Sequence, residues 1–221
     1  MERVTFEKKK PQTFSVAFYD TETSTDPKVV GWNNHKNMKF ACGCVHVAVY
    51  SAEEGEWRLT TEVSHAYLDV DQFAQKLNSC DLVVGFNNIA FDDKFITAHA
   101  GKDQDFLIKR FDMYDDLVAR TGIKFVTGLD ELAKTTIGEG KTEGISGELV
   151  PKMWQEGKRD EVVAYCKQDC KVLFDIFEFA KKYNYVLLQP NKNQDLFGNM
   201  VLKIPVDWAR VFPEISEESM V

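Results

Sequence analysis

The chain has 221 residues, of which 44% are hydrophobic and 28% are charged, a composition that excludes a largely disordered protein. Its net charge of −8 excludes binding of nucleic acid through a global basic surface. No apolar run approaches the roughly 20 residues that span a bilayer, and the N-terminal sequence MERVTFEKKK is charged, with no apolar signal region behind it. We therefore expect a cytoplasmic protein, neither inserted in a membrane nor secreted, that holds any polyanion by local contacts.

The first predicted elements form an antiparallel meander. Residues 13–19 (TFSVAFY) are rich in β-branched and aromatic side chains and precede the polar Asp20, which predicts a buried strand that ends there. Residues 39–51 and 56–63 predict two further strands, joined by a hairpin loop at residues 53–55. The sheet is therefore expected to begin with antiparallel strands.

Helices and strands alternate in the next part of the chain. Residues 69–71 (DVD) can cap a helix over residues 72–78, and residues 81–86 (DLVVGF) predict a short buried strand. Residues 91–100 have a helical pattern, and residues 106–113 have a strand-like one. This alternation predicts an α/β domain with a mixed sheet.

Three helices and a loop follow. Residues 114–120 predict a helix that stops before Gly122, and residues 129–137 predict another. Residues 138–149 are rich in glycine and poor in apolar side chains, so we expect a mobile loop that can act as a lid. Residues 160–183 carry apolar side chains at steps of three and four residues, which predicts a long helix.

The C-terminal residues are expected to extend the domain. The stretch after the long helix favours a short hairpin around residues 191–198, and residues 213–221 favour an acidic, frayed tail. We expect a single domain over residues 1–221, with its core at about residues 13–183 and an extension at 184–221. Its mixed central sheet should have antiparallel first strands and helices on both faces.

Two carboxylates follow the first predicted strand. Asp20 and Glu22 are two residues apart in extended chain, so both side chains point to the same side and can share a hard cation. The alternative is a polar strand end without a chemical role, because Asp-x-Glu is a common tripeptide.

The sequence GFNNIAFDDKF contains a third candidate carboxylate. Residues 85–88 predict a sharp exit from a buried strand, in which Asn87 can hold the loop by side-chain hydrogen bonds. Phe91 then anchors the chain in the core and holds Asp92 beside it. The alternative is a helix N-terminal cap, a role that suits Asp92 or Asp93.

The predicted long helix carries a fourth candidate carboxylate. Tyr165 and Asp169 in AYCKQDC are four residues apart, so they project from one face about one turn apart. A carboxylate can bind a metal ion, and a phenol one turn away can orient a water molecule for attack on a phosphorus atom. The alternative is that Tyr165 lies at the rim of the core and Asp169 is solvated.

The cysteines indicate a reducing cytoplasm, because they lack the paired spacing of a zinc ribbon or a disulfide framework. Cys42, Cys44 and His46 alternate on one face of a strand and could bind a metal ion with three ligands. Buried thiols that pack as small hydrophobic groups are the favoured interpretation, for Cys166 and Cys170 as well. The five cysteines are Cys42, Cys44, Cys80, Cys166 and Cys170.

A glycine-containing tripeptide in the predicted loop has two interpretations. Gly140-Lys141-Thr142 looks like the end of a phosphate-binding loop, but Thr135 stands where an earlier glycine is required, which argues against an ATP site. Lys141 can instead contact a substrate phosphate, or it can be a solvated lysine.

Joined in order, YDTET, GFNNIAFD and YCKQD resemble the three exonuclease motifs of the DEDD superfamily, tyrosine subtype. The segments TGLDELAKTTIG, GKTEGISGE and PKMWQEGKRDEVVAYCKQD extend the resemblance over about residues 14–183 and are similar to the YprB-like RNase H-fold domain. That domain is related to the proofreading domains of family B DNA polymerases. The resemblance implies an RNase H-like α/β fold and two-metal-ion, 3′ to 5′ hydrolysis of phosphodiester bonds in nucleic acid.

The resemblance also implies a role for each matching residue. Asp20 would bridge two divalent cations, Mg²⁺ or Mn²⁺, with Glu22 and Asp169 completing the tighter site. Asp92, which the Phe-Asp dipeptide favours over its neighbour, would serve the second cation, mainly through water. Tyr165 would position the attacking water. The residues expected to contact substrate are Thr21, Asn87 and Lys141.

Three functions compete. A metal-dependent exonuclease leads, because a non-catalytic RNase H-fold module that recruits or scaffolds a helicase or polymerase would lack at least one of the five residues. An endonuclease of the RNase H or resolvase kind is disfavoured by the pairing of Tyr165 with Asp169. We expect a single strand or the 3′ end of a duplex as substrate, DNA rather than RNA, although no motif senses a 2′-hydroxyl group. A helicase or polymerase is a candidate partner in DNA repair or replication, and a bacterial or phage source suits the family.

Overall fold

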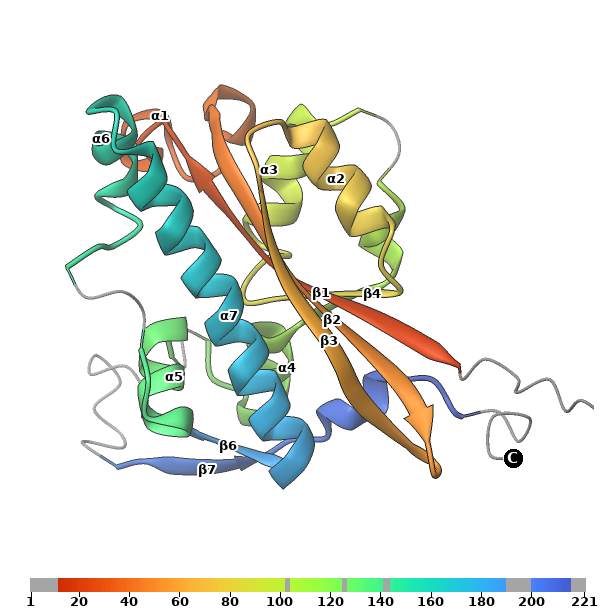
Figure 1. Cartoon of the computed structure of the whole chain (residues 1–221). Helices are drawn as coiled ribbons and strands as arrows, with labels where there is room; N and C mark the ends of the chain where they lie inside the picture. The colour runs from red at the N-terminus through yellow and green to blue at the C-terminus, as the bar shows by residue number, and fades with distance from the viewer. Residues whose placement is uncertain (1–11, 102–103, 125–126, 141–143, 190–199, 216–221) are drawn as a thin grey trace, which may run out of the picture.

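The computed structural model describes residues 12–101, 104–124, 127–140, 144–189 and 200–215. Its centre is a five-stranded mixed sheet with the strand order β3-β2-β1-β4-β5 (Figure 1). β1, β2 and β3 form the predicted antiparallel meander, whereas β4 and β5 run parallel to β1. The strands span Thr13–Thr23 (β1), Phe40–Glu53 (β2), Glu56–Tyr67 (β3), Leu82–Gly85 (β4) and Arg110–Asp112 (β5).

Helices cover both faces of the sheet, as predicted. α7 crosses one face over β1 and β2, with α4 and α5 beside it, and α2 and α3 lie on the other face (Figure 1). The helices span Pro27–Val30 (α1), Val70–Asn78 (α2), Asp92–His99 (α3), Met113–Thr121 (α4), Leu129–Ile137 (α5), Val150–Gln155 (α6) and Arg159–Tyr183 (α7), with 3₁₀ segments at His35–Asn37, Asp105–Ile108 and Trp208–Val211. No helix among the described residues is long and apolar enough to cross a membrane.

β1 is buried on both faces because its side chains alternate between two hydrophobic cores. Phe18 packs against Phe174 and Phe177 of α7, with ring centroids 5.4 and 5.2 Å apart. The next side chain, Tyr19, faces the opposite core and packs against Phe73 of α2. The strand that carries Asp20 is therefore fixed between two layers of helices.

The C-terminal residues pack against this framework. β6 (Tyr185–Leu188) and β7 (Leu202–Pro205) form the strands of the predicted hairpin, whose turn around residues 191–198 lies outside the described residues. Trp208 is buried against Phe177, and its indole N–H donates to Asp116 at 2.8 Å. The end of the chain therefore contributes to the main core. The predicted tail is described only to residue 215.

Several predicted boundaries are wrong, for identifiable reasons. β1 continues past Asp20 to Thr23 because β2 pairs with it as far as Phe40, so the backbone hydrogen bonds outlast the apolar side chains. Residues 106–113 contain a 3₁₀ turn before the short β5, because Asn78 accepts the Phe106 N–H and the Lys109 ammonium there.

Two short helices were absent from the prediction. α6 begins directly after the loop predicted at residues 138–149, and its Pro151 stands in the first turn, where a missing N–H costs no hydrogen bond. α1 is capped by Asp26, which accepts the Lys28 N–H at 2.8 Å. Both helices are too short for an apolar period to reveal them.

Candidate active site

Three carboxylates converge at the end of β1. Asp20 and Glu22 lie on the same side of this strand, and Asp169 reaches them from α7, with one oxygen of each within 4.8 Å of the others. Glu22 and Asp169 are buried, with 8% and 1% of their surfaces exposed. Three like charges at this spacing repel one another, and oxygen donors of this kind suit Mg²⁺ or Mn²⁺. The donor set therefore fits a hard divalent cation.

Thiol contacts hold α7 against the sheet beside these carboxylates. The Cys166 thiol donates to the backbone oxygen of Asp20 at 3.5 Å, and the Cys170 thiol donates to that of Cys44 at 3.2 Å. Because Cys166 and Cys170 flank Asp169 on the helix, these contacts fix its position relative to β1.

Asp92 lies beside the three-carboxylate group without belonging to it. It begins α3 and its Oδ1 accepts hydrogen bonds from Thr21, from the backbone N–H at 3.1 Å and from Oγ1 at 2.5 Å. Burial, together with the charge of the neighbouring Asp93, raises the pKa of Asp92 to about 7. Thr21 therefore holds Asp92, the fourth predicted carboxylate, at the end of β1 where the other three lie. The backbone N–H and the hydroxyl of Thr21 are both engaged in this contact.

Asp93 is held elsewhere. Its carboxylate accepts a hydrogen bond from the Tyr19 hydroxyl and pairs with Arg110 at 3.0 Å. Burial raises its pKa, although both partners act in the opposite direction. Asp93 is therefore engaged with Tyr19 and Arg110, whereas Asp92 contacts Thr21, which lies between Asp20 and Glu22 on β1.

Tyr165 is buried on α7, with 2% of its surface exposed. It packs in a small core with Cys42, Cys44, Val150 and Val162, one helical turn before the position of Asp169. The ring is thus enclosed by side chains from β2, α6 and α7.

A cavity of about 470 Å³ opens next to Asp20. Asn87 lines it from the loop after β4, in a left-handed conformation with φ 62° that asparagine tolerates. The sequence analysis had named two of the residues that line this cavity, Asp20 and Asn87, as candidate site residues, but it missed the others. These are Phe86, Tyr114, Thr127, Gly128, Leu129, Asp130, Glu131 and Leu173. Lys141 lies outside the described residues.

Asp112 is a further residue that sequence reasoning missed. Its buried carboxylate accepts the N–H groups of Asn87 at 2.8 Å and Ile89 at 3.1 Å, and it also caps α4 through Tyr114 and Asp115. Burial raises its pKa in spite of these donors. The sequence FDMYDD offered a signal, since an aspartate just before a helix is a common N-terminal cap, but the strand predicted over residues 106–113 included Asp112.

Replacing Asp112 with alanine should destabilise the protein by about 2–3 kcal/mol, since α4 loses its cap, at about 0.5–2 kcal/mol, and the loop at Asn87 and Ile89 loses two partly buried hydrogen bonds, at about 1 kcal/mol each. Urea unfolding monitored by circular dichroism measures the effect. Asp115→Ala is the matched control, because Asp115 is an exposed acidic residue in the same helical turn. Equal midpoints for the two variants would show that Asp112 does not anchor the Asn87 loop.

His46 does not join the cysteines on its strand. Its ring nitrogens contact Ser64 at 2.8 Å and Glu62 at 3.0 Å on β3. Cys42 and Cys44 face Cys166 instead. The three-ligand set of Cys42, Cys44 and His46 is therefore not formed.

The sequence matches a family model of the RNase H superfamily, RNase_H_2, over residues 17–181. No curated protein matches the sequence significantly. The matched range runs from β1 to the last turn of α7 and so includes both elements that supply the three-carboxylate group. Members of this superfamily are typically nucleases that use divalent metal ions. With its five-stranded mixed sheet and surrounding helices, the chain belongs to the RNase H superfamily.

Proposed function

We propose that the protein is a metal-dependent 3′ to 5′ exonuclease of the DEDD superfamily, tyrosine subtype. The observation that carries the proposal is the approach of Asp20, Glu22 and Asp169 to within 4.8 Å of one another. Two of these residues come from one strand and the third from a helix about 150 positions later in the sequence, so the fold itself brings them together.

Each carboxylate has a distinct role in this proposal. Asp20, the least buried of the three, would contact both metal ions, while Glu22 and Asp169 would complete the tighter site. Asp92 would serve the second site, a role that its contact with Thr21 at the same end of β1 supports. When bound, two divalent ions would neutralise the carboxylates and stabilise the charge that develops on the phosphodiester oxygens.

Tyr165 and Asn87 complete the proposed site. The Tyr165 hydroxyl would orient the attacking water molecule by a hydrogen bond. The cavity beside Asp20, at about 470 Å³, falls in the range of about 300–1,000 Å³ that is usual for small-ligand sites. It would admit the 3′-terminal nucleotide, with Asn87 as a contact.

The substrate we propose is a single strand or the 3′ end of a duplex, with DNA favoured over RNA. Because the net charge is −8, metal binding is expected to precede substrate binding, since it removes the repulsion between the carboxylates and the phosphate. The apo protein should bind nucleic acid poorly.

Digestion of 5′-labelled linear oligonucleotides tests the proposal. With Mg²⁺ or Mn²⁺, DNA should shorten progressively from its 3′ end, and chelator should abolish the reaction. A closed single-stranded circle is the control, because it has no 3′ end and should persist. Cleavage of the circle would instead indicate an endonuclease. No digestion of DNA or RNA with either metal would support a non-catalytic module.

A further inference from the structure

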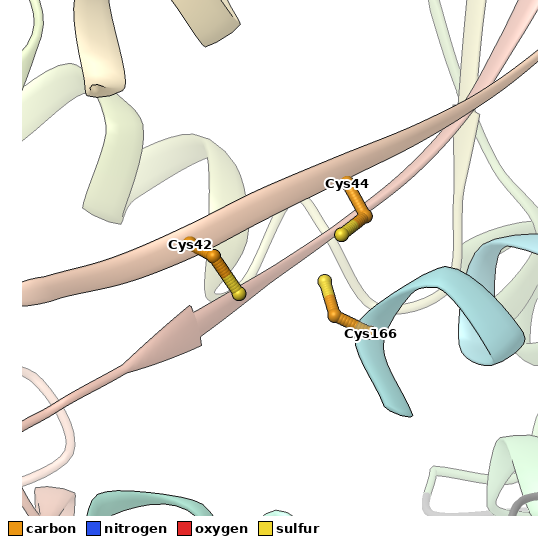
Figure 2. Close-up of side chains that lie close together, drawn as sticks. All are labelled: Cys42, Cys44 and Cys166. Carbon is orange, nitrogen blue, oxygen red and sulfur yellow. The ribbon is translucent and has the colours of Figure 1, made fainter. Parts of the chain in front are cut away.

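Three cysteine thiols meet between the sheet and α7, next to the carboxylate group. Cys42 and Cys44 project from β2 and Cys166 projects from α7, so that the sulfur atoms point toward one another (Figure 2). Their Sγ atoms all lie within 4.8 Å of one another, and none of the three side chains is exposed. None of them forms a disulfide bond.

A fourth thiol lies within reach. Cys170 follows Cys166 by one helical turn, is equally buried, and interacts with the Cys166 thiol. Its Sγ atom lies 3.2 Å from the backbone oxygen of Cys44. Two elements therefore each present a pair of thiols, at i and i+2 on the strand and at i and i+4 on the helix.

The remaining cysteine shows what a packing thiol looks like in this fold. Cys80 is buried in the opposite core with Phe73 and Leu77, and its thiol donates to the backbone oxygen of Lys76 at 3.6 Å. Cys42, Cys44 and Cys166, by contrast, face one another. Hydrogen bonds from single thiols to backbone oxygens, such as that of Cys80, do not require thiols to gather, so the convergence of three sulfur atoms calls for a separate reason.

We propose that Cys42, Cys44, Cys166 and Cys170 form a structural zinc site, separate from the carboxylate site. Thiolates are soft ligands that select Zn²⁺, whereas carboxylates suit Mg²⁺ and Mn²⁺. A Zn–S bond of about 2.3 Å places tetrahedral sulfur atoms about 3.8 Å apart, so the sulfur atoms of Cys42, Cys44 and Cys166 need to close in by about 1 Å at most. The sulfur atom of Cys170, which lies outside that group of three, has a larger movement to make. Each thiol that binds gives its proton to solvent.

The ion would join β2 to α7. Cys166 is adjacent to Tyr165 and Cys170 is adjacent to Asp169, so the same cross-link would set the position of the helix that carries both. Because all four thiols are fully buried, zinc would enter before β2 and α7 pack, during folding. The site does not depend on nuclease activity.

The test is refolding of the full chain with Co²⁺ as a spectroscopic probe for zinc. The protein is unfolded in denaturant with reductant and chelator, then refolded with one equivalent of Co²⁺. We expect a thiolate-to-cobalt charge-transfer band, which oxygen ligands cannot produce, and its loss when Zn²⁺ is added. Cys80→Ser should keep the full band, whereas Cys44→Ser should lose most of it.

A stability measurement on the unmodified chain provides a second readout. At a free zinc concentration of about 100 times the Kd, the unfolding equilibrium constant should fall about 100-fold. If Cys44→Ser fails to fold, Cys42→Ala replaces it as the variant. Absence of the band in the unmodified chain, an undiminished band in the Cys44 or Cys42 variant, or unfolding insensitive to zinc would each overturn the proposal.

Discussion

Asp20→Ala is expected to abolish nuclease activity while raising stability in metal-free buffer. Loss of the carboxylate proposed to contact both ions removes several kcal/mol of charge stabilisation, which corresponds to a loss of rate of about 10³-fold or more. The same change removes one of three carboxylates that lie within 4.8 Å of one another, so it relieves their repulsion. If the relief is about 1 kcal/mol, Tm should rise by about 2–4 °C.

Two measurements with one control check this result. Exonuclease rates with Mn²⁺ and thermal unfolding in chelator are recorded for Asp20→Ala and for Asp175→Ala. Asp175 lies on α7 but pairs with Lys171 at 2.5 Å, outside the three-carboxylate group, so its variant should keep activity and should not gain stability. A retained rate would remove Asp20 from the site, and a lower Tm in chelator would show that the carboxylates are not strained.

Tyr165→Phe should slow the reaction by about 10²- to 10⁴-fold, the usual range for a positioned proton-handling group. Metal affinity should stay nearly unchanged, because only the hydroxyl is lost and the buried ring can still pack against Val150 and Val162. Asp169→Asn should instead weaken metal binding, because it removes a charge from the three-carboxylate group. The Tyr165→Phe variant should stay slow at saturating Mn²⁺, whereas added Mn²⁺ should partly restore the rate of Asp169→Asn.

Exonuclease rate against Mn²⁺ concentration separates the two variants. Tyr183→Phe serves as the control for the phenol, since Tyr183 lies on the same helix with 47% of its surface exposed. It should behave as the unmodified protein. A Tyr165→Phe enzyme with an unchanged rate at every Mn²⁺ concentration would exclude Tyr165 from the reaction.

Local sequence patterns determined most of the framework. The helix over Leu129–Ile137 was predicted with its observed bounds, and the long helix begins one residue before its predicted start and ends at Tyr183 as predicted. Apolar periodicity over several turns locates such helices without reference to the rest of the chain. The hairpin between β2 and β3 was equally local, because Glu54 and Gly55 both adopt the positive φ that a tight turn requires.

Part of the candidate site was also local. The spacing of Asp20 and Glu22 places both carboxylates on one side of an extended strand, whatever surrounds them. Their approach to Asp169 was not readable from spacing, since it depends on how α7 crosses β1. That crossing is set by the packing of Phe18 against Phe174 and Phe177.

Tertiary structure alone decided the remaining features. Asp92 and Asp93 are adjacent and chemically identical, and only their surroundings separate them: Thr21 binds the first, whereas Tyr19 and Arg110 bind the second. The same holds for the thiols. Cys42, Cys44 and His46 lie on one face of β2, so their spacing does not distinguish them. In the fold, the His46 imidazole contacts side chains of β3, whereas Cys42 and Cys44 meet the Cys166 thiol of α7. Short-range periodicity fixes which way a side chain points, whereas the groups that it meets belong to distant parts of the chain.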